Sequence, residues 1–431
     1  MRVIGPVGAV AVVAGSMLGI GIFLTPPLVA AAAPSAGWFY GLWLLGGVVA
    51  LSGAMVYAEL GTLQPEAGGD VIFQHRVLGP AIAGASGMVM FALAFAGSLA
   101  AMSAAVCQYQ LATVTGYDFS APVLGIPGYQ LGGMVVVLAI TALNVLSVRL
   151  TAWVQTVLTA IPVVLLVGLA LWGLSEPAAA GTSSGDPSGL VGAWMAVYFT
   201  YAGWPAVIYV AGEVRRPERS LPIGLLGGTA ITMVLYLLLC AAFVHVLGMS
   251  GLAAAGEAGS AVADALAGEV GAVGMSGLVA LALLASINGT ALGGARVADA
   301  MAERGVLPAV LRRRAPGAPS VALWVQAALA CLLLLTGGFS TILNITTLAM
   351  MLIGSLTVIS AIILRLRGER GAFLAPLFPL PALVYLCSSA AAIVLFITQS
   401  TELLEPLLGI GLFVVTAAVL LVLHSRRDRP V

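Results

Sequence analysis

The sequence predicts an all-α membrane protein with 12 transmembrane helices, and three observations lead to this fold class. Of the 431 residues, 61% are hydrophobic and only 8% are charged, whereas soluble domains have about 25% charged residues. Apolar runs of about 20 residues, the length that crosses a bilayer as a helix, follow one another along the chain. Basic residues fall only in alternate connections between these runs. These features indicate a multi-pass protein of the inner or plasma membrane.

The apolar runs define the predicted spans in chain order. We expect helices over residues 6–33, 37–62, 82–113, 130–147, 151–174, 190–213, 222–248, 270–298, 320–336, 341–364, 376–398 and 404–423. The connections between them are shorter than about 25 residues, which is too short for a further folded domain. The whole chain is therefore expected to lie in or at the lipid bilayer.

The basic residues orient these spans. All 17 are arginines, and with alternating connections they share one side: Arg2, Arg76, Arg149, Arg215, Arg216, Arg219, Arg296, Arg304, Arg312, Arg313, Arg314, Arg365, Arg367, Arg370, Arg426, Arg427 and Arg429. The other side carries acidic residues: Asp118, Glu176, Asp186, Glu257, Asp264, Glu402 and Glu405. Because positively charged connections stay in the cytoplasm, both termini are predicted to be cytoplasmic. A miscounted span would break this alternation, and the net charge of zero gives no indication of a nucleic-acid partner.

Two further features have simple interpretations. Arg2, the first apolar run and the segment AAAPSAG resemble a signal peptide, but the run is too long and its loss would leave an odd number of spans. The four cysteines, Cys107, Cys240, Cys331 and Cys387, fall within predicted spans, where a thiol acts as a small hydrophobic side chain. The sequence contains no disulfide framework and no metal-ligand spacing.

The first span is interrupted near its centre. The segment AVVAGSMLGIGIFLTPP, residues 11–27, places Gly15, Gly19 and Gly21 before Pro26 and Pro27. Relative to alanine, glycine costs a helix interior about 1 kcal/mol and proline about 3 kcal/mol. In hydrocarbon, irregular backbone persists only where it is buried or lines a cavity. The free N–H groups after such a break suit a carboxylate, and the free carbonyl groups before it suit an ammonium group. The alternative is close helix packing through small residues.

The sixth span is interrupted in the same way. The segment VYFTYAGWPAVIYVAGE has Gly203 and Pro205 at its centre, and a proline there forces the helix to bend or unwind. Spans one and six are the first members of two sets of five spans, and paired interruptions at corresponding positions indicate a transporter's central site. We therefore expect an inverted repeat of five plus five helices, residues 1–175 and 188–368, with two peripheral helices in residues 374–425.

The polar residues limit the possible functions. No acidic residue and no arginine lies near the two interruptions, since Glu59 and Glu213 fall at helix ends, and an intramembrane charge would normally mark a charged ligand. A neutral ligand is therefore favoured.

We expect no enzyme and no cofactor, because nucleophiles, acids and metal ligands do not cluster. A channel would need a polar stripe along a span, and an ATP-driven pump would need a phosphate-binding loop. The sequence shows neither feature. His245 is more simply a packing residue than a proton relay. A non-transporting amino acid sensor remains the alternative from another class.

Four segments carry a resemblance to a known family. They are GSMLGIGIF at 15–23, YAELGTLQPEAGGDVIF at 57–73, YAGWPAVIYVAGEVRRPERSLP at 201–222 and ASINGTALGGARVADAMAERGVLP at 285–308. In this order and in these spans they resemble amino acid permeases of the amino acid–polyamine–organocation (APC) superfamily, nearest to the L-type amino acid transporter (LAT) branch. The resemblance implies a core of five plus five helices with discontinuous helices 1 and 6, and alternating access.

The resemblance also implies a substrate site. The substrate carboxylate would bind N–H groups of the first interruption, at Gly19, Ile20 and Gly21. The ammonium group would bind main-chain carbonyls, which match Met17, Phe199 and Ala202. Phe199 matches an aromatic gate, and Trp204, beside Gly203, would flank the pocket for the substrate side chain. Because Ile20, Phe199 and Trp204 are apolar, we expect a neutral amino acid substrate, preferably an apolar one.

This chain departs from the family pattern at two positions. Many relatives have serine where this chain has Ile20, so one hydroxyl contact to the carboxylate is lost. The fifth-helix lysine of the family, which acts as an internal cation or as a titratable group, aligns with Pro162. Exchange or facilitated flux is therefore the leading mechanism. A sodium- or proton-coupled symporter, or an exporter, is the alternative, with Ser286 and Thr290 as weak sodium candidates.

One cytoplasmic connection offers candidates for an inner gate. The segment EVRRPERS at 213–220 follows the sixth span. We expect that Glu213 and Glu218 could pair there with Arg296 or Arg304.

Overall fold

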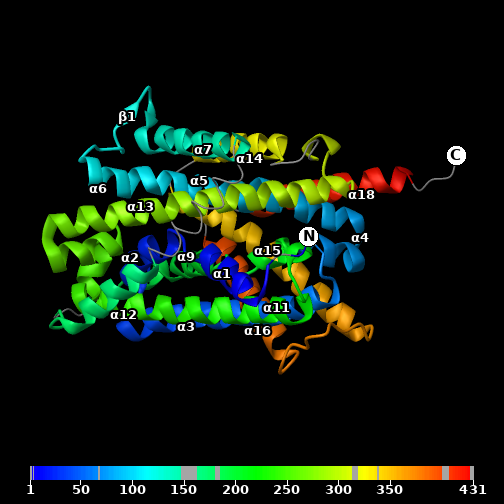
Figure 1. Cartoon of the computed structure of the whole chain (residues 1–431), viewed down its shortest axis with the longest axis horizontal. Coiled ribbons are helices and arrows are strands. Elements are labelled where there is room, and N and C mark those ends of the chain that lie inside the picture. The colour runs from blue at the N-terminus through cyan, green and yellow to red at the C-terminus, as the bar shows by residue number, and fades with distance from the viewer. Residues whose placement is uncertain are drawn as a thin grey trace.

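Long helices that lie roughly side by side make up the protein (Figure 1). The computed structural model describes residues 2, 4–66, 68–146, 163–179, 185–312, 319–336, 339–399 and 407–427. The predictions that concern Arg149 and Pro162 therefore lie outside the described residues. Helices α4 and α18 contact each other at one end of the molecule, and β1 lies at the other end (Figure 1).

The first half of the chain contains the broken first helix and four further helical segments. Its elements are α1 (Pro6–Met17), α2 (Gly21–Ala32), α3 (Ala36–Leu63), α4 (Asp70–Val89), η1 (Met90–Phe95), α5 (Ala96–Ala105), η2 (Val106–Leu111), α6 (Ala112–Thr115), β1 (Pro122–Val123), β2 (Ile126–Pro127), α7 (Gly128–Leu146) and the helix Val163–Ser175. Elements α4 to α6 form one helical segment, Asp70–Thr115.

The second half begins with another broken helix. Its elements are η3 (Pro187–Gly189), α9 (Leu190–Tyr201), α10 (Ala206–Tyr209), η4 (Ala211–Glu213), α11 (Pro217–Pro222), η5 (Ile223–Gly227), α12 (Gly228–Ala254), α13 (Ala258–Glu303), η6 (Ala309–Leu311), α14 (Ser320–Leu334), α15 (Phe339–Leu366), α16 (Leu380–Gln399), η7 (Leu407–Gly411) and α18 (Leu412–Arg427).

Within the described residues, seven helices are long and apolar enough to cross a membrane. The pair α1 and α2 passes the same test as one span that is bent by 48°. The protein is therefore a helical, multi-pass membrane protein. The count of 12 spans and the inverted repeat stay predictions.

Several helices extend beyond the predicted apolar runs. Helix α4 begins at Asp70 instead of residue 82, and α13 begins at Ala258 instead of residue 270. Each contains a glycine with positive φ, Gly79 (φ 84°) and Gly268 (φ 65°), which kinks the helix where the apolar run starts. Hydropathy detects only the part of a helix that lies in hydrocarbon, so these amphipathic extensions were missed. The short β1–β2 hairpin is a small departure from the all-α prediction.

Ion pairs join the connections on the arginine-rich side. Arg365 on α15 contacts Glu59 on α3 at 2.8 Å, and Ala375 N–H donates to the same carboxylate at 2.9 Å. Arg296 pairs with Glu213 at 3.7 Å, as expected for a gate, but Arg304 pairs with Glu66 at 2.8 Å instead. These contacts tie α3, α13 and α15 together at one end of the molecule.

The Glu59–Arg365 pair gives a stability prediction. Glu59→Gln removes the negative charge and leaves the partly buried Arg365 guanidinium without its counter-ion. Since hydrogen bonds to charged groups contribute about 1.5–3 kcal/mol, we expect the melting temperature in detergent to fall clearly. Glu213→Gln is the matched control, because Glu213 and Arg296 are both more exposed and exposed pairs contribute about 0–1 kcal/mol. Equal melting temperatures for the two variants would contradict this ranking.

Candidate functional site

The first helix is interrupted where the sequence predicts. Helix α1 ends at Met17, Leu18 has extended backbone angles (φ −71°, ψ 91°), and α2 begins at Gly21. Phe23 and Leu24 N–H both donate to the Ile20 carbonyl, at 3.0 and 3.1 Å. In the part of the chain that the structure describes, no main-chain acceptor is found for the N–H groups of residues 19–22. The start of α2 thus presents unpaired donors, as a helix N-terminus does.

The sixth helix is interrupted at Gly203 and Pro205. Helix α9 ends at Tyr201 and the short α10 begins at Ala206, with the Ala206 N–H bonded to the Gly203 carbonyl at 3.2 Å. Gly203 lies directly against the main chain of the other interruption, because a Cβ at this position would overlap the carbonyl group of Ser16. The two broken helices therefore meet at their breaks.

Hydroxyl groups fix this crossing. Tyr236 on α12 donates to the Met17 carbonyl and lies 3.3 Å from the Thr200 carbonyl, so one phenol joins both broken helices. On the other side of the crossing the hydroxyls of Thr25 and Thr200 are 2.8 Å apart. A Cβ on Gly21 would overlap the Thr200 side chain. Sequence reasoning missed Tyr236 and Thr200, although a buried phenol in a membrane helix signals a polar partner.

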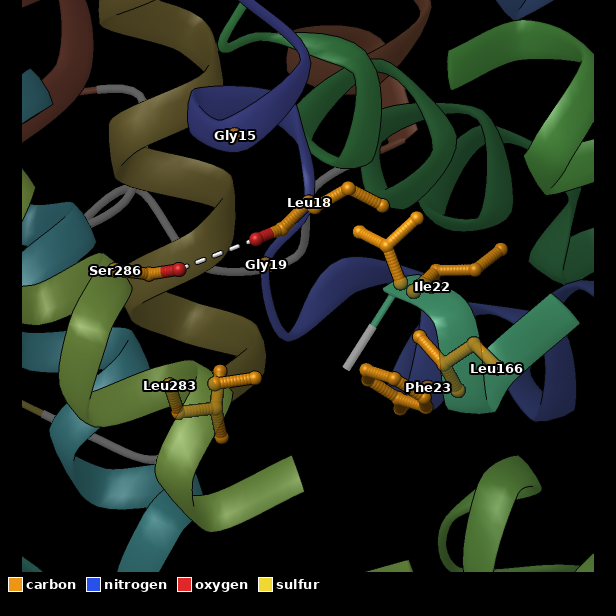
Figure 2. A pocket seen from close by; sticks show the side chains of 10 residues that line it. Gly15, Leu18, Gly19, Ile22, Phe23, Leu166, Leu283 and Ser286 are labelled. Carbon is orange, nitrogen blue, oxygen red and sulfur yellow. Dashed lines mark hydrogen bonds between the residues drawn. The ribbon is translucent and has the colours of Figure 1, made fainter. Parts of the chain in front are cut away.

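A narrow cavity opens on the first interruption (Figure 2). Gly15, Leu18, Gly19, Ile22 and Phe23 line it from α1, α2 and the break between them, and further lining residues come from the helix Val163–Ser175 and α13: Val163, Leu166, Ala282, Leu283 and Ser286. Its free volume is about 20 Å³, enough for about one water molecule. Ser286 Oγ, its one side-chain polar group, donates to the Leu18 carbonyl at 3.1 Å (Figure 2).

Comparison with known proteins decides the family. The family described as "Amino acid permease" matches residues 4–421. The chain belongs to the amino acid permease family. Its APC-superfamily resemblance is thereby confirmed, and with it the expectation that the protein is not an enzyme.

Individual relatives of this permease are exchangers or transporters by name. The chain is 27% identical over 405 residues to the serine/threonine exchanger SteT of Bacillus subtilis, an alignment that covers 90% of this chain and 89% of SteT. It is 30% identical over 257 residues to the mouse b(0,+)-type amino acid transporter 1, covering 57% of this chain and 51% of that protein. The human protein of that name is 25% identical over 383 residues, covering 84% of this chain and 76% of its own length.

The structure brings five of the eight predicted site residues together at the crossing of the two breaks. Met17, Gly19, Ile20 and Gly21 form the first interruption, and Gly203 contacts it from the sixth helix. Phe199 and Ala202 are half-buried, and the Phe199 carbonyl accepts from Ala202 N–H at 3.0 Å. Their contact with a substrate stays a prediction.

Trp204 is buried among aromatic side chains of α3 and α16. Its ring packs edge-to-face against Tyr57 on α3, 4.7 Å between centroids, and against Tyr385 on α16 at 6.3 Å. This is the geometry of aromatic core packing. A role of Trp204 beside the substrate side chain stays a prediction.

Both weak sodium candidates make hydrogen bonds, Ser286 through its hydroxyl group and Thr290 through its main-chain carbonyl. Ser286 is bonded to the Leu18 carbonyl, and the Thr290 carbonyl accepts from Gln326 Nε2 at 3.5 Å. Among the described residues, no group of three or more His, Cys, Asp or Glu side chains could hold a metal ion. His245 Nε2 lies 2.7 Å from the Glu176 carbonyl, which is hydrogen-bond distance.

The crossing of the two breaks gives a prediction for Gly203→Ala. The added methyl group would overlap the Ser16 carbonyl, so the broken helices must separate, and we expect substrate binding and uptake to fall at least about tenfold. Gly277→Ala on α13 is the matched control, because a Cβ there meets nothing within 4 Å. Binding by isothermal titration calorimetry checks this, and an unchanged affinity in Gly203→Ala would refute the close contact.

Tyr236→Phe tests the hydroxyl that joins both helices. The Met17 carbonyl would lose its donor while the ring stays packed against Trp43 and Tyr201. We expect a loss of about 1–2 kcal/mol of unfolding free energy, measured as a lower melting temperature, together with weaker substrate binding. Tyr117→Phe, an exposed tyrosine on the hairpin side, should leave both quantities unchanged.

Proposed function

We propose that this permease moves neutral amino acids across the cytoplasmic membrane by alternating access, in exchange or by facilitated flux. The observation that carries the proposal is the meeting of the two broken helices. Unpaired N–H groups at residues 19–22 suit a carboxylate, and main-chain carbonyls at the end of α1 and around Ala202 suit an ammonium group. Such a site binds a zwitterion without any buried charged side chain.

The lining of the cavity supports a neutral substrate side chain. All ten of its residues are uncharged, and only Ser286 contributes a polar side chain. A cationic or acidic side chain would there lose its hydration without a compensating partner. Apolar side chains are preferred in our proposal, and small hydroxylated side chains are tested beside them because SteT is a serine/threonine exchanger by name.

Alternating access is supported by the difference between the two ends of the molecule. On the side opposite the arginines, a hollow of about 290 Å³ lies among α2, η3, α9 and α15, with Ala196 and Leu343 in its wall. On the arginine-rich side the ion pairs of Glu59, Glu66 and Glu213 join neighbouring helices. The cavity at the break, with room for about one water, would have to widen to admit an amino acid.

We place the chain in an inverted repeat of five plus five helices, with 12 spans and both termini in the cytoplasm. The paired breaks of α1/α2 and α9/α10 support the repeat. Proline at position 162, in place of the family lysine, supports uncoupled transport. An oppositely directed exporter or an ion-coupled symporter is the second candidate.

Reconstitution in liposomes tests the proposal. Vesicles preloaded with unlabelled leucine, serine or no amino acid would take up labelled leucine, serine or arginine in sodium-free buffer, with and without a pH gradient. We expect uptake of the neutral amino acids that needs an internal amino acid and ignores the pH gradient. The Gly203→Ala variant, for which we expect at least about tenfold lower uptake, is the comparison for low activity, and vesicles without protein give the background.

Other outcomes would each overturn a different part. Uptake only after sodium is added would replace exchange by symport and assign the ion to Ser286 and Thr290. Preferred uptake of arginine would refute the neutral site. Binding of an amino acid without any uptake would favour the sensor.

A further inference from the structure

A buried carboxylate lies on the arginine-rich side of the crossing and has no part in the proposed substrate site. Asp70, the first residue of α4, is 1% exposed. Tyr57 on α3 and Thr357 on α15 donate to its Oδ1, the latter at 2.7 Å, and Tyr209 on α10 donates to its Oδ2 at 2.9 Å. Within the described chain, no arginine or histidine lies within ion-pair distance of Asp70. Hydroxyl groups from three separate helices therefore hydrogen-bond to this carboxylate.

Two of the four segments that carry the family resemblance meet at this point. Tyr57 and Asp70 belong to the segment 57–73, and Tyr209 belongs to the segment 201–222. The bond between Tyr209 and Asp70 is thus a direct link between the second broken helix and the start of α4.

The chain before Asp70 is shaped around the Tyr209 ring. Gly69 has a positive φ of 58°, and a Cβ there would overlap the Tyr209 ring. On the other side, the ring packs edge-to-face against Phe95 at 5.6 Å, in η1. A Cβ on Gly61 of α3 would likewise overlap Ile208 of α10. The half-helix α10 therefore packs against α3, the start of α4 and η1. We call its hydrogen bond from Tyr209 to Asp70 the anchor.

The position of α10 makes this anchor relevant to transport. Helix α10 follows the break at Gly203 and Pro205 and contacts both α1 and α13. A route from the break to the arginine-rich side must displace α10 from one of these neighbours. The Tyr209–Asp70 bond would resist that displacement, because a hydrogen bond to a carboxylate is stronger than one between neutral groups.

We propose that Asp70 is a positioning residue of the transport cycle, which holds α10 through Tyr209 and stabilises the state closed toward the arginine-rich side. This inference rests on the proposed transport function. Gln74 contacts the anchor through Thr357. Its Nε2 donates to Thr357 Oγ1 at 2.9 Å and to the Ile353 carbonyl at 3.0 Å. Opening of that side would then include the release of Tyr209 from Asp70, while Tyr57 and Thr357 keep the carboxylate hydrogen-bonded.

The test uses Tyr209→Phe, which removes the phenol oxygen and keeps the ring. Exchange of the neutral amino acid that the wild type prefers would be measured in right-side-out and inside-out vesicles, which give the half-saturation constant at each face. Because each constant varies inversely with the fraction of protein open to that face, their ratio follows the conformational equilibrium. Loss of one charge-assisted hydrogen bond should lower the ratio of inner to outer constant about tenfold. A merely structural defect would lower the maximal rate from both faces and leave this ratio unchanged.

Two further variants keep the test decisive. Tyr385→Phe is the matched control, since Tyr385 is also a tyrosine of the helix core and bonds to Tyr198 instead of the carboxylate. It should leave the ratio unchanged. Asp70→Asn should shift the ratio in the same direction as Tyr209→Phe, and the double variant should add little to Asp70→Asn, because both changes remove one interaction. If Tyr209→Phe fails to fold, Asp70→Asn alone carries the test.

The outcomes separate this inference from the transport function itself. A wild-type protein that exchanges no amino acid would overturn the proposed function. A wild type that exchanges normally, with Tyr209→Phe and Asp70→Asn both leaving the ratio as in Tyr385→Phe, would overturn only the role of Asp70.

Discussion

Backbone polar groups in hydrocarbon must be paired or face a cavity, and the structure around the two breaks is organised by this constraint. An unpaired N–H or C=O group there costs several kcal/mol. The breaks free such groups in α1/α2 and in α9/α10, and the contact of Gly203 with Ser16 brings them to one place. Tyr236 satisfies the Met17 carbonyl, and Ser286 the Leu18 carbonyl. In our proposal the N–H groups of residues 19–22, for which the described chain supplies no main-chain acceptor, bind the substrate carboxylate.

Around the crossing, hydroxyl side chains make the polar contacts between helices. Around the crossing, Thr25, Thr200, Tyr236 and Ser286 bond to main-chain groups or to each other. Each such bond is worth little by itself, about 1 kcal/mol, so several can be rearranged together during a conformational change. On the arginine-rich side, ion pairs and the Asp70 anchor join the helices instead. In our proposal the crossing of the two breaks therefore binds a zwitterion without an opposing buried charge.

The site could be predicted from sequence only where a local pattern determines it. Gly19, Gly21, Gly203 and Pro205 mark the breaks because glycine and proline weaken a helix wherever they occur, and the structure has both breaks at these residues. The ion pair of Glu213 with Arg296 was also expected. The partner of Arg304 and the extensions of α4 and α13 were not, since they depend on how helices pack and continue beyond the apolar runs.

The sequence by itself determined the membrane setting, the helical class and the two breaks. Each of these follows from the hydropathy, charge or backbone preference of a short segment. Only the tertiary structure decided which groups meet. Asp70 and Thr357 are bonded although 287 residues separate them, and Tyr236 reaches Met17 across 219 residues. Such contacts arise from the packing angles of whole helices, which no local pattern specifies.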